Sequence, residues 1–398
     1  MGKATKALHL ARAMTSQASG VNISPDLGSN TKSFRNLLMN GDMNIAQRLA
    51  VEQSGLGASS FTGINTTTYI MDRWRWAQDA DCVVTLSRST DVPAGLGFPA
   101  SFKVDVTTVD SSIGADQLAH IQTAIEGRDL QHLLYGTSFA KKLTLSFWVK
   151  STKTGTYCIC LRKPDNTAYG FIKEYTINTA DTWEKKIIHI EPDSNIKASG
   201  GAIDNDTGLG FRVIWALCVG SNDTGTDNAW NADSSGAKTA TTNQVNFLDN
   251  TANDFYLTGC QLEVGDKATE FDFVPTDIET FRCKRYYQRY NRNANYAGLG
   301  VVVPWSTTNG NLLWTMEVQP RGNPSIEYGD LSHFDIFGVT GTGSTGVPTG
   351  FSNSGWAGGT SIDIGVTGSG FVAARAMLVE YDNTSTNLPA FLAINAEL

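Results

Sequence analysis

The sequence predicts an all-β protein built from two β-sandwiches, with one short helical segment at the N-terminus and another between the sandwiches. Three observations predict this fold class. Only 18% of the 398 residues are charged, against roughly 25% in an average globular chain. The chain has 39 glycines and is rich in Ser, Thr and Asn, which are weak helix formers. Beyond residue 34, short apolar runs alternate with turns, which is typical of antiparallel sheets.

Residues 3–18 carry small, basic and apolar side chains at helical spacing and predict a short amphipathic helix. Leu8, Ala11 and Met14 lie along its thin apolar stripe. An isolated helix of this length is marginal in water. The segment is therefore either a frayed terminus or a docking helix that orders against a partner or another copy of the chain. Together with a linker predicted at 19–32, it defines an N-terminal docking segment at residues 1–35.

The first sandwich is predicted at residues 36–276. Within 143–150, alternate residues such as Leu145 and Phe147 share one face, and Trp148 lies on the other. Residues 115–135 look helical, but Gly127 interrupts the pattern, so a strand followed by a short helix near 129–134 is expected. Strands are predicted at 81–87, 102–106, 143–150, 156–161, 170–177, 184–190, 210–219 and 254–264.

A connecting helix is predicted at residues 277–290, within a boundary segment at 277–295. Thr276 is a candidate N-cap, and Glu279 three residues later would complete a capping box. The β pattern then restarts and predicts a second, distal β-sandwich at 296–398, a length typical of such modules. Its expected strands are 297–303, 311–318, 325–328, 361–366, 370–380 and 390–394, with a Gly/Thr/Ser-rich loop at 340–359.

Charge and composition exclude several function classes. The net charge of -8 and the absence of long basic runs argue against nucleic-acid binding. No apolar stretch is long enough for a transmembrane helix, and the start of the chain lacks the apolar core of a signal peptide, so synthesis in a cytoplasm is expected. The six cysteines lack metal-ligand spacing and are expected to be reduced and structural.

The sequence does not predict an enzyme, and no cofactor or metal is expected. None of the five histidines stands near a nucleophile elbow, and no calcium-binding loop of the required ligand order is present. Glycan hydrolysis would need a carboxylate pair at the scissile bond. The most distinctive carboxylates, Glu263, Glu270 and Asp272, are expected to serve turns or cross-strand pairs instead.

Tryptophans are the strongest candidates for ligand contacts. Three of the nine, Trp230, Trp305 and Trp356, stand in polar, turn-rich sequence. An exposed indole face can stack on the apolar face of a sugar ring while nearby Asn and Asp bind its hydroxyls. The alternative interpretation is that loop tryptophans close the ends of the sandwiches.

Three segment groups, in their order along the chain, resemble tail-fibre and virion appendage proteins of tailed bacteriophages. They are 36–48 with 69–74, 143–150 with 182–185, and 257–271 with 283–287. The second group also resembles carbohydrate-binding jelly rolls. The resemblance implies a jelly-roll fold for residues 36–276 and a place in the virion, reached from the host cytoplasm and extracellular after lysis.

The resemblance also implies other virion proteins as partners, a homotrimer, and host-surface saccharide as the ligand of the distal sandwich. Trimerisation would bring the apolar stripe at Leu8, Ala11 and Met14 against its copies. Two other functions stay open: a capsid decoration or tail-assembly protein that binds only virion subunits and, less favoured, a glycan-degrading enzyme.

Overall fold

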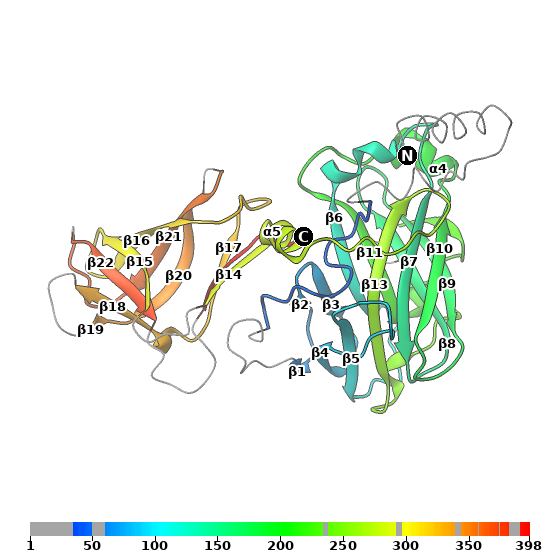
Figure 1. Cartoon of the computed structure of the whole chain (residues 1–398), viewed down its shortest axis with the longest axis horizontal. Coiled ribbons are helices and arrows are strands. Elements are labelled where there is room, and N and C mark those ends of the chain that lie inside the picture. Colours follow the sequence, from blue (N-terminus) through cyan, green and yellow to red (C-terminus); the bar gives the residue numbers. More distant parts are fainter. Residues whose placement is uncertain are drawn as a thin grey trace, which may run out of the picture.

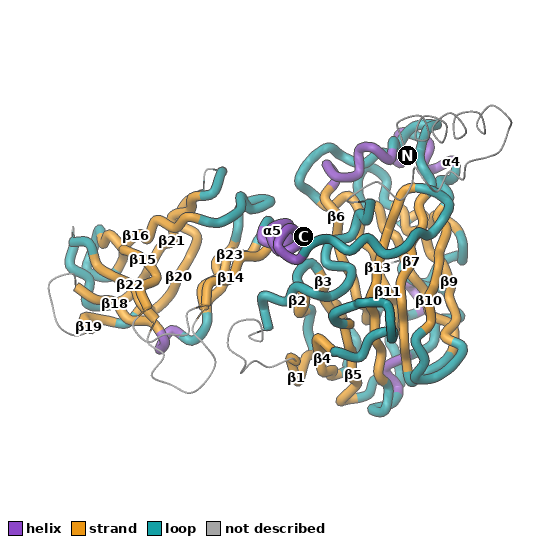
Figure 2. Tube along the Cα trace, viewed as in Figure 1, coloured by secondary structure: helices purple, strands orange, loops and turns teal. Residues whose placement is uncertain are grey.

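Two β-sheet units, joined by helix α5 (Thr276–Lys284), lie at opposite ends of an elongated molecule (Figure 1). The computed structural model describes residues 35–49, 60–233, 238–291, 297–338, 344–356, 358–373, 375–381 and 391–398. Strands dominate both units and helices are short (Figure 2). The predicted all-β fold class is confirmed.

The larger unit is a sandwich of two antiparallel sheets. One has the strand order β1-β4-β5-β13-β7-β10 and the other β12-β9-β8-β11-β6-β3-β2, so neighbouring strands are often distant in sequence, as in a jelly roll. The strands are β1 (Ser60–Ile64), β2 (Thr68–Met71), β3 (Trp74–Gln78), β4 (Val83–Ser89), β5 (Ser101–Thr108), β6 (Leu118–Glu126), β7 (Leu143–Ser151), β8 (Gly155–Lys163), β9 (Tyr169–Ile177), β10 (Glu184–Ile190), β11 (Leu209–Val219), β12 (Ala229–Ala232) and β13 (Asp254–Val264). The short helices are η1 (Gly127–Leu133), α4 (Ser194–Lys197), η2 (Ser199–Gly201), η3 (Ser221–Asp223) and η4 (Phe247–Asp249).

The core of the larger unit lies between its sheets and is rich in aromatic side chains. Trp215 of β11 packs against Trp74 of β3, with ring centroids 5.3 Å apart, and against Phe147 of β7 at 5.7 Å. All three side chains are fully buried. Leu145 and Phe147 of β7 lie in this core, as predicted, but the opposite face of the strand is largely buried as well. The predicted change from strand to helix at Gly127, between β6 and η1, is confirmed.

Helix α5 is shorter than predicted, and the expected capping box is wrong. Pro275 is the N-cap and makes no side-chain cap, while Glu279 accepts a hydrogen bond from the backbone N of Asn40 in the larger unit. The chain after Lys284 forms β14 (Tyr287–Asn291), which pairs with β23 (Phe391–Asn395). The sequence pattern of 285–290 is helical, but the backbone from Tyr287 onward pairs with strand β23 instead. This pairing with a distant strand overrides the local helical pattern.

The C-terminal unit also contains two sheets, ordered β14-β23-β17 and β19-β18-β22-β15-β16-β21-β20. The loop predicted at 340–359 is wrong in part, since it contains β19 and β20; pairing with β21 orders β20 despite its low apolar content. Between the sheets lies a core that includes Phe334, Ile364 and Leu392. The remaining elements are β15 (Ala297–Pro304), β16 (Asn309–Thr315), β17 (Ser325–Tyr328), η5 (Leu331–His333), β18 (Phe334–Gly338), β19 (Ser344–Gly346), β20 (Pro348–Gly355), β21 (Ser361–Gly368) and β22 (Met377–Tyr381).

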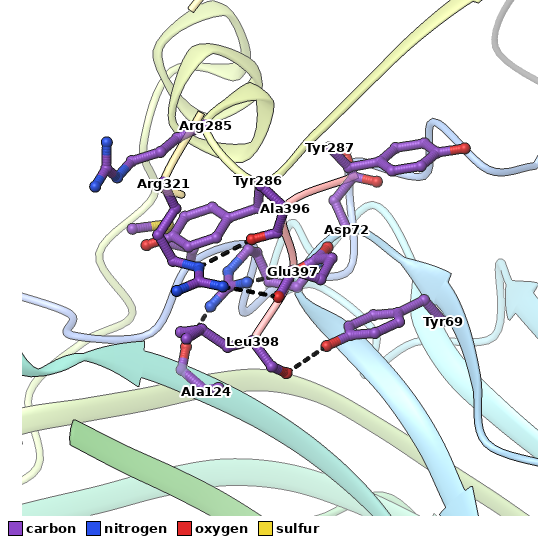
Figure 3. A network of polar contacts seen from close by, with 12 residues as sticks. Tyr69, Asp72, Ala124, Arg285, Tyr286, Tyr287, Arg321, Ala396, Glu397 and Leu398 are labelled. Carbon is purple, nitrogen blue, oxygen red and sulfur yellow. Dashed lines mark hydrogen bonds and ion pairs between the residues drawn. The ribbon is translucent and has the colours of Figure 1, made fainter. Parts of the chain in front are cut away.

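Residues 396–398 return from β23 to the larger unit and join the two units (Figure 3). The carboxylate of Glu397 forms an ion pair with Arg73, and both side chains are almost fully buried. Arg321 Nη2 donates to the carbonyl oxygen of Glu397 at 3.1 Å, and the Tyr69 hydroxyl donates to the carbonyl oxygen of Leu398 at 2.8 Å. These contacts connect the C-terminal segment to the larger unit.

A second ion pair supports the same junction, from the residues that directly follow helix α5. Arg285 Nε and Nη2 donate to the two carboxylate oxygens of Glu126 at 2.7 and 2.9 Å, and the Tyr286 hydroxyl donates to Glu126 at 2.6 Å. Burial alone would raise the pKa of Glu126, but the hydrogen bonds from Arg285 and Tyr286 hold it below its ordinary value. Glu126 is therefore ionised at neutral pH.

Asp42 gives the larger unit a pH-dependent stability. Burial and then the charge of Glu279 raise its pKa from 3.8 to about 6. The folded protein holds this proton where the unfolded chain has lost it, so stability falls as the pH rises through that range. We expect Asp42→Asn to raise the free energy of unfolding at pH 7 by ~1–3 kcal/mol. Urea denaturation at pH 4 and pH 7 checks this; an equal gain at both pH values would contradict it.

Candidate functional site

An open groove in the C-terminal unit is the strongest candidate site. Residues 323–326, at the start of β17, form one wall, and residues 351–356, at the end of β20, form the other. Strands β17 and β20 are edge strands of the two sheets of this unit, so the groove lies between the edges of the sheets. Its lining side chains include amides, hydroxyls and one indole, and none of them is ionisable.

Trp356 supplies the aromatic surface of the groove. It follows β20, and its half-buried ring packs against the edge of the C-terminal core. Its Nε1 donates to the carbonyl oxygen of Gly359 at 3.2 Å. Gly358 and Gly359 have φ values of 99° and 80°, a left-handed conformation that glycine adopts without strain. The tight turn anchors the indole by its edge and leaves part of the ring exposed.

Two asparagines join the walls of the groove. Asn353 Nδ2 donates to Asn323 Oδ1 at 2.8 Å and to the carbonyl oxygen of Pro324 at 2.7 Å. Asn353 Oδ1 and Asn323 Nδ2 make no hydrogen bond with another described residue. The groove therefore offers one acceptor and one donor next to an aromatic ring, which suits a ligand whose hydroxyls both donate and accept.

The other two predicted tryptophans lie outside the groove. Trp305 is 66% exposed in the turn between β15 and β16, beside Thr308, which bonds to Gly368 at the end of β21. Trp356 stands near the start of that eight-residue strand, on the order of 20 Å away. The structure does not bring Trp305 and Trp356 together.

Trp230 is not a surface residue, and its prediction as a ligand contact is corrected. It is 6% exposed, its Nε1 donates to the carbonyl oxygen of Glu191 at 2.8 Å, and its ring packs on Phe171 and Tyr135. It closes one part of the larger core, as the alternative interpretation of the loop tryptophans proposed. The predicted docking residues Leu8, Ala11 and Met14 lie outside the described residues.

Of the distinctive carboxylates, Glu263 serves a turn, as predicted, whereas Asp272 Oδ2 accepts a hydrogen bond from the backbone N of Arg35 at 2.9 Å. Glu263 accepts hydrogen bonds from Gln261 Nε2 at 3.0 Å and from the backbone N of Thr269 at 2.9 Å. Within the part of the chain that the structure describes, no group of His, Cys, Asp and Glu side chains is arranged to hold a metal ion. No described helix is long and apolar enough to cross a membrane.

Sequence reasoning missed Asn323 and Asn353. The dipeptide Asn323-Pro324 predicts a turn, but nothing in the sequence places it beside a residue thirty positions later. The contact depends on the order of strands in two sheets. Only Trp356 was identified from its sequence context.

Comparison with known proteins gives structural matches. No family model matches the sequence, and no curated protein matches it. The chain is similar to the enzymatically active domain of tailspike protein 4 from bacteriophage CBA120, with 14% identity and a TM-score of 0.28, over 58% of this chain and 22% of that one.

Two further structural matches are a putative sugar-binding protein and a carbohydrate-binding module. One is a putative sugar-binding protein from Bacteroides thetaiotaomicron, with 13% identity and a TM-score of 0.31, over 58% of this chain and all of that one. The other is a family 11 carbohydrate-binding module of a cellulosomal cellulase from Clostridium thermocellum, with 10% identity and a TM-score of 0.26, over 54% and 99%.

Proposed function

We propose that the protein is a phage virion appendage, most simply a tail fibre, whose C-terminal groove binds saccharide on the host surface. The composition of the groove carries the proposal: an anchored indole lies beside an amide donor and an amide acceptor, with no ionisable side chain among the lining residues. A sugar ring would stack on Trp356 while its hydroxyls reach Asn323 and Asn353.

The groove is open, which suits weak binding to an extended polymer. In a virion, several copies would act together and raise the overall affinity through their effective concentration. The order of the sequence segments at 36–48, 143–150 and 257–271 supports the virion location, with other virion proteins as partners and a homotrimer as the assembly.

Binding without cleavage is part of the proposal. Glycoside hydrolysis commonly uses two carboxyl groups that flank the bond, and no residue that lines the groove is Asp or Glu. A capsid decoration or tail-assembly protein is the alternative, and it would bind virion subunits without binding host polysaccharide.

Substituting Trp356 tests the proposed function. We expect Trp356→Ala to weaken binding of the purified full chain to host polysaccharide about tenfold, because a lost aromatic contact costs ~1.5 kcal/mol. Trp305→Ala is the matched control, since it removes a more exposed indole outside the groove, and it should bind as the unmodified protein does. Immobilised lipopolysaccharide and capsular polysaccharide from a panel of bacterial strains serve as ligands.

Three results would contradict the proposal. Equal binding by Trp356→Ala and the unmodified chain would exclude the groove as the site. Binding to none of the surface polysaccharides would favour the assembly alternative. Release of reducing ends from a bound polysaccharide would show an enzyme.

A further inference from the structure

Three arginines on the outer face of the larger unit form a second feature, remote in sequence from the groove. Arg75 of β3, Arg212 of β11 and Arg162 of β8 come from one sheet. Arg212 lies directly opposite Arg162, and Arg75 lies opposite Gln122 of β6. Because Trp74 and other residues adjacent to them along these strands are buried in the core, alternation places the three arginines on the outer face.

The positive charge of this cluster is only partly compensated. Arg162 forms an ion pair with Asp233 at 3.0 Å. Neither Arg75 nor Arg212 forms an ion pair with a carboxylate among the described residues. Burial, followed by the charges of Arg75 and Arg162, lowers the pKa of Arg212 to about 10. The cluster therefore carries an internal repulsion that a bound anion would relieve.

Two polar, neutral side chains of β6, His120 and Gln122, lie on the same face as Arg75. His120 Nε2 lies 3.0 Å from the side-chain amide of Gln122, and burial lowers the pKa of His120 to about 3, so this imidazole is uncharged at neutral pH. Donors and acceptors match when the amide nitrogen of Gln122 donates to His120 Nε2 and its oxygen accepts from the guanidinium of Arg75. Gln122 then orients Arg75 without neutralising it.

We propose that this arginine face, defined by Arg75, Arg162 and Arg212, is a second ligand site that binds an acidic saccharide through its carboxylates. A guanidinium binds a carboxylate by two parallel hydrogen bonds. Arg75 and Arg212 stand two strands apart, on the order of 10 Å, which fits a polymer with spaced charges better than one small ion. The source of the saccharide, the host surface, rests on the proposed function.

Nucleic acid fits this face less well than acidic saccharide does. A nucleic acid presents dense phosphate charge, and its affinity depends on many Lys and Arg contacts. Here three arginines stand on a chain with a net charge of -8. A duplex DNA oligonucleotide is therefore the competing ligand in the test.

Binding of the full chain to polygalacturonate tests the site, and the same polymer with methyl-esterified carboxylates is the matched ligand. We expect polygalacturonate to bind at low salt and to weaken as salt is added, and the ester to bind at least tenfold more weakly. Arg212→Gln should lose at least tenfold in affinity without a lower melting temperature, because it removes a repelled charge. Arg375→Gln, at an exposed position of the C-terminal unit, should bind normally.

Four results would overturn the site: no binding of polygalacturonate at low salt, equal binding of acid and ester, unchanged affinity of Arg212→Gln, or tighter binding of the DNA. The two sites fail separately. Loss of neutral-polysaccharide binding in Trp356→Ala together with unchanged polygalacturonate binding in Arg212→Gln would retain the groove and reject the arginine face. Unchanged neutral-polysaccharide binding in Trp356→Ala, together with weaker polygalacturonate binding in Arg212→Gln, would reject the groove and retain the arginine face.

Discussion

Glu397→Ala is expected to lower the free energy of unfolding by about 3–5 kcal/mol, because it leaves a buried charge without its partner. The side chains of Arg73 and Glu397 are 1% and 4% exposed. Burial lowers the pKa of Arg73, yet Glu397 and nearby tyrosines raise it above its ordinary value, and the guanidinium also stacks 3.4 Å over the ring of Tyr286. In the Glu397→Ala variant, the guanidinium of Arg73 stays buried but has lost the carboxylate of its ion pair.

Urea denaturation followed by tryptophan fluorescence measures this loss, and Glu317→Ala is the matched control. Glu317 also pairs with a basic residue, Lys284, at 2.6 Å, but its side chain is 54% exposed. An exposed ion pair of this kind contributes under ~1 kcal/mol. Faster proteolysis near helix α5 in Glu397→Ala would show that the units have separated. Equal, small effects of both variants would contradict the role given to the buried pair.

Trp215→Ala is expected to cost a similar amount, about 3–5 kcal/mol, through a cavity in the larger core. Trp215 is fully buried and contacts the rings of Trp74 and Phe147, so no single neighbour can fill the space. The two sheets meet at this point. Loss of the indole therefore weakens contacts from both sides of the sandwich.

The control for this variant is Trp305→Ala, which removes an indole that is 66% exposed. Its free energy of unfolding should change by no more than ~0.5 kcal/mol. Thermal and urea denaturation of both variants check the difference. If Trp215→Ala were no less stable than Trp305→Ala, the described core would be wrong.

Local patterns predicted most of the strands, but two segments were assigned wrongly. Strand β17 begins and ends where the sequence predicts, and the alternating run in β7 has its expected buried face. Residues 285–290 and 340–359 were misjudged. Residues 285–290 contain the start of β14, whose partner β23 lies far along the chain, and this pairing overrides the local helical pattern. Residues 340–359 contain β20, whose partner β21 follows directly in sequence; its Gly, Ser and Thr content hid the strand.

The residues of the candidate sites were also only partly predictable from the sequence. Trp356 was predicted from its glycine-rich context, but Asn353 and Asn323 meet because β17 and β20 are edge strands of two sheets and lie against each other. The arginine face is built from strands β3, β8 and β11, and no segment of the sequence looks basic there. Trp230 had a polar, turn-like context and is buried, because strand β12 pairs with β9.

The most direct test of the saccharide groove is a crystal structure of the full chain bound to an oligosaccharide from a polysaccharide that it binds. We expect one sugar ring to stack on Trp356, with hydroxyls within hydrogen-bonding distance of Asn323 Nδ2 and Asn353 Oδ1. A neutral oligosaccharide bound elsewhere, with the groove between β17 and β20 empty, would contradict the proposed site.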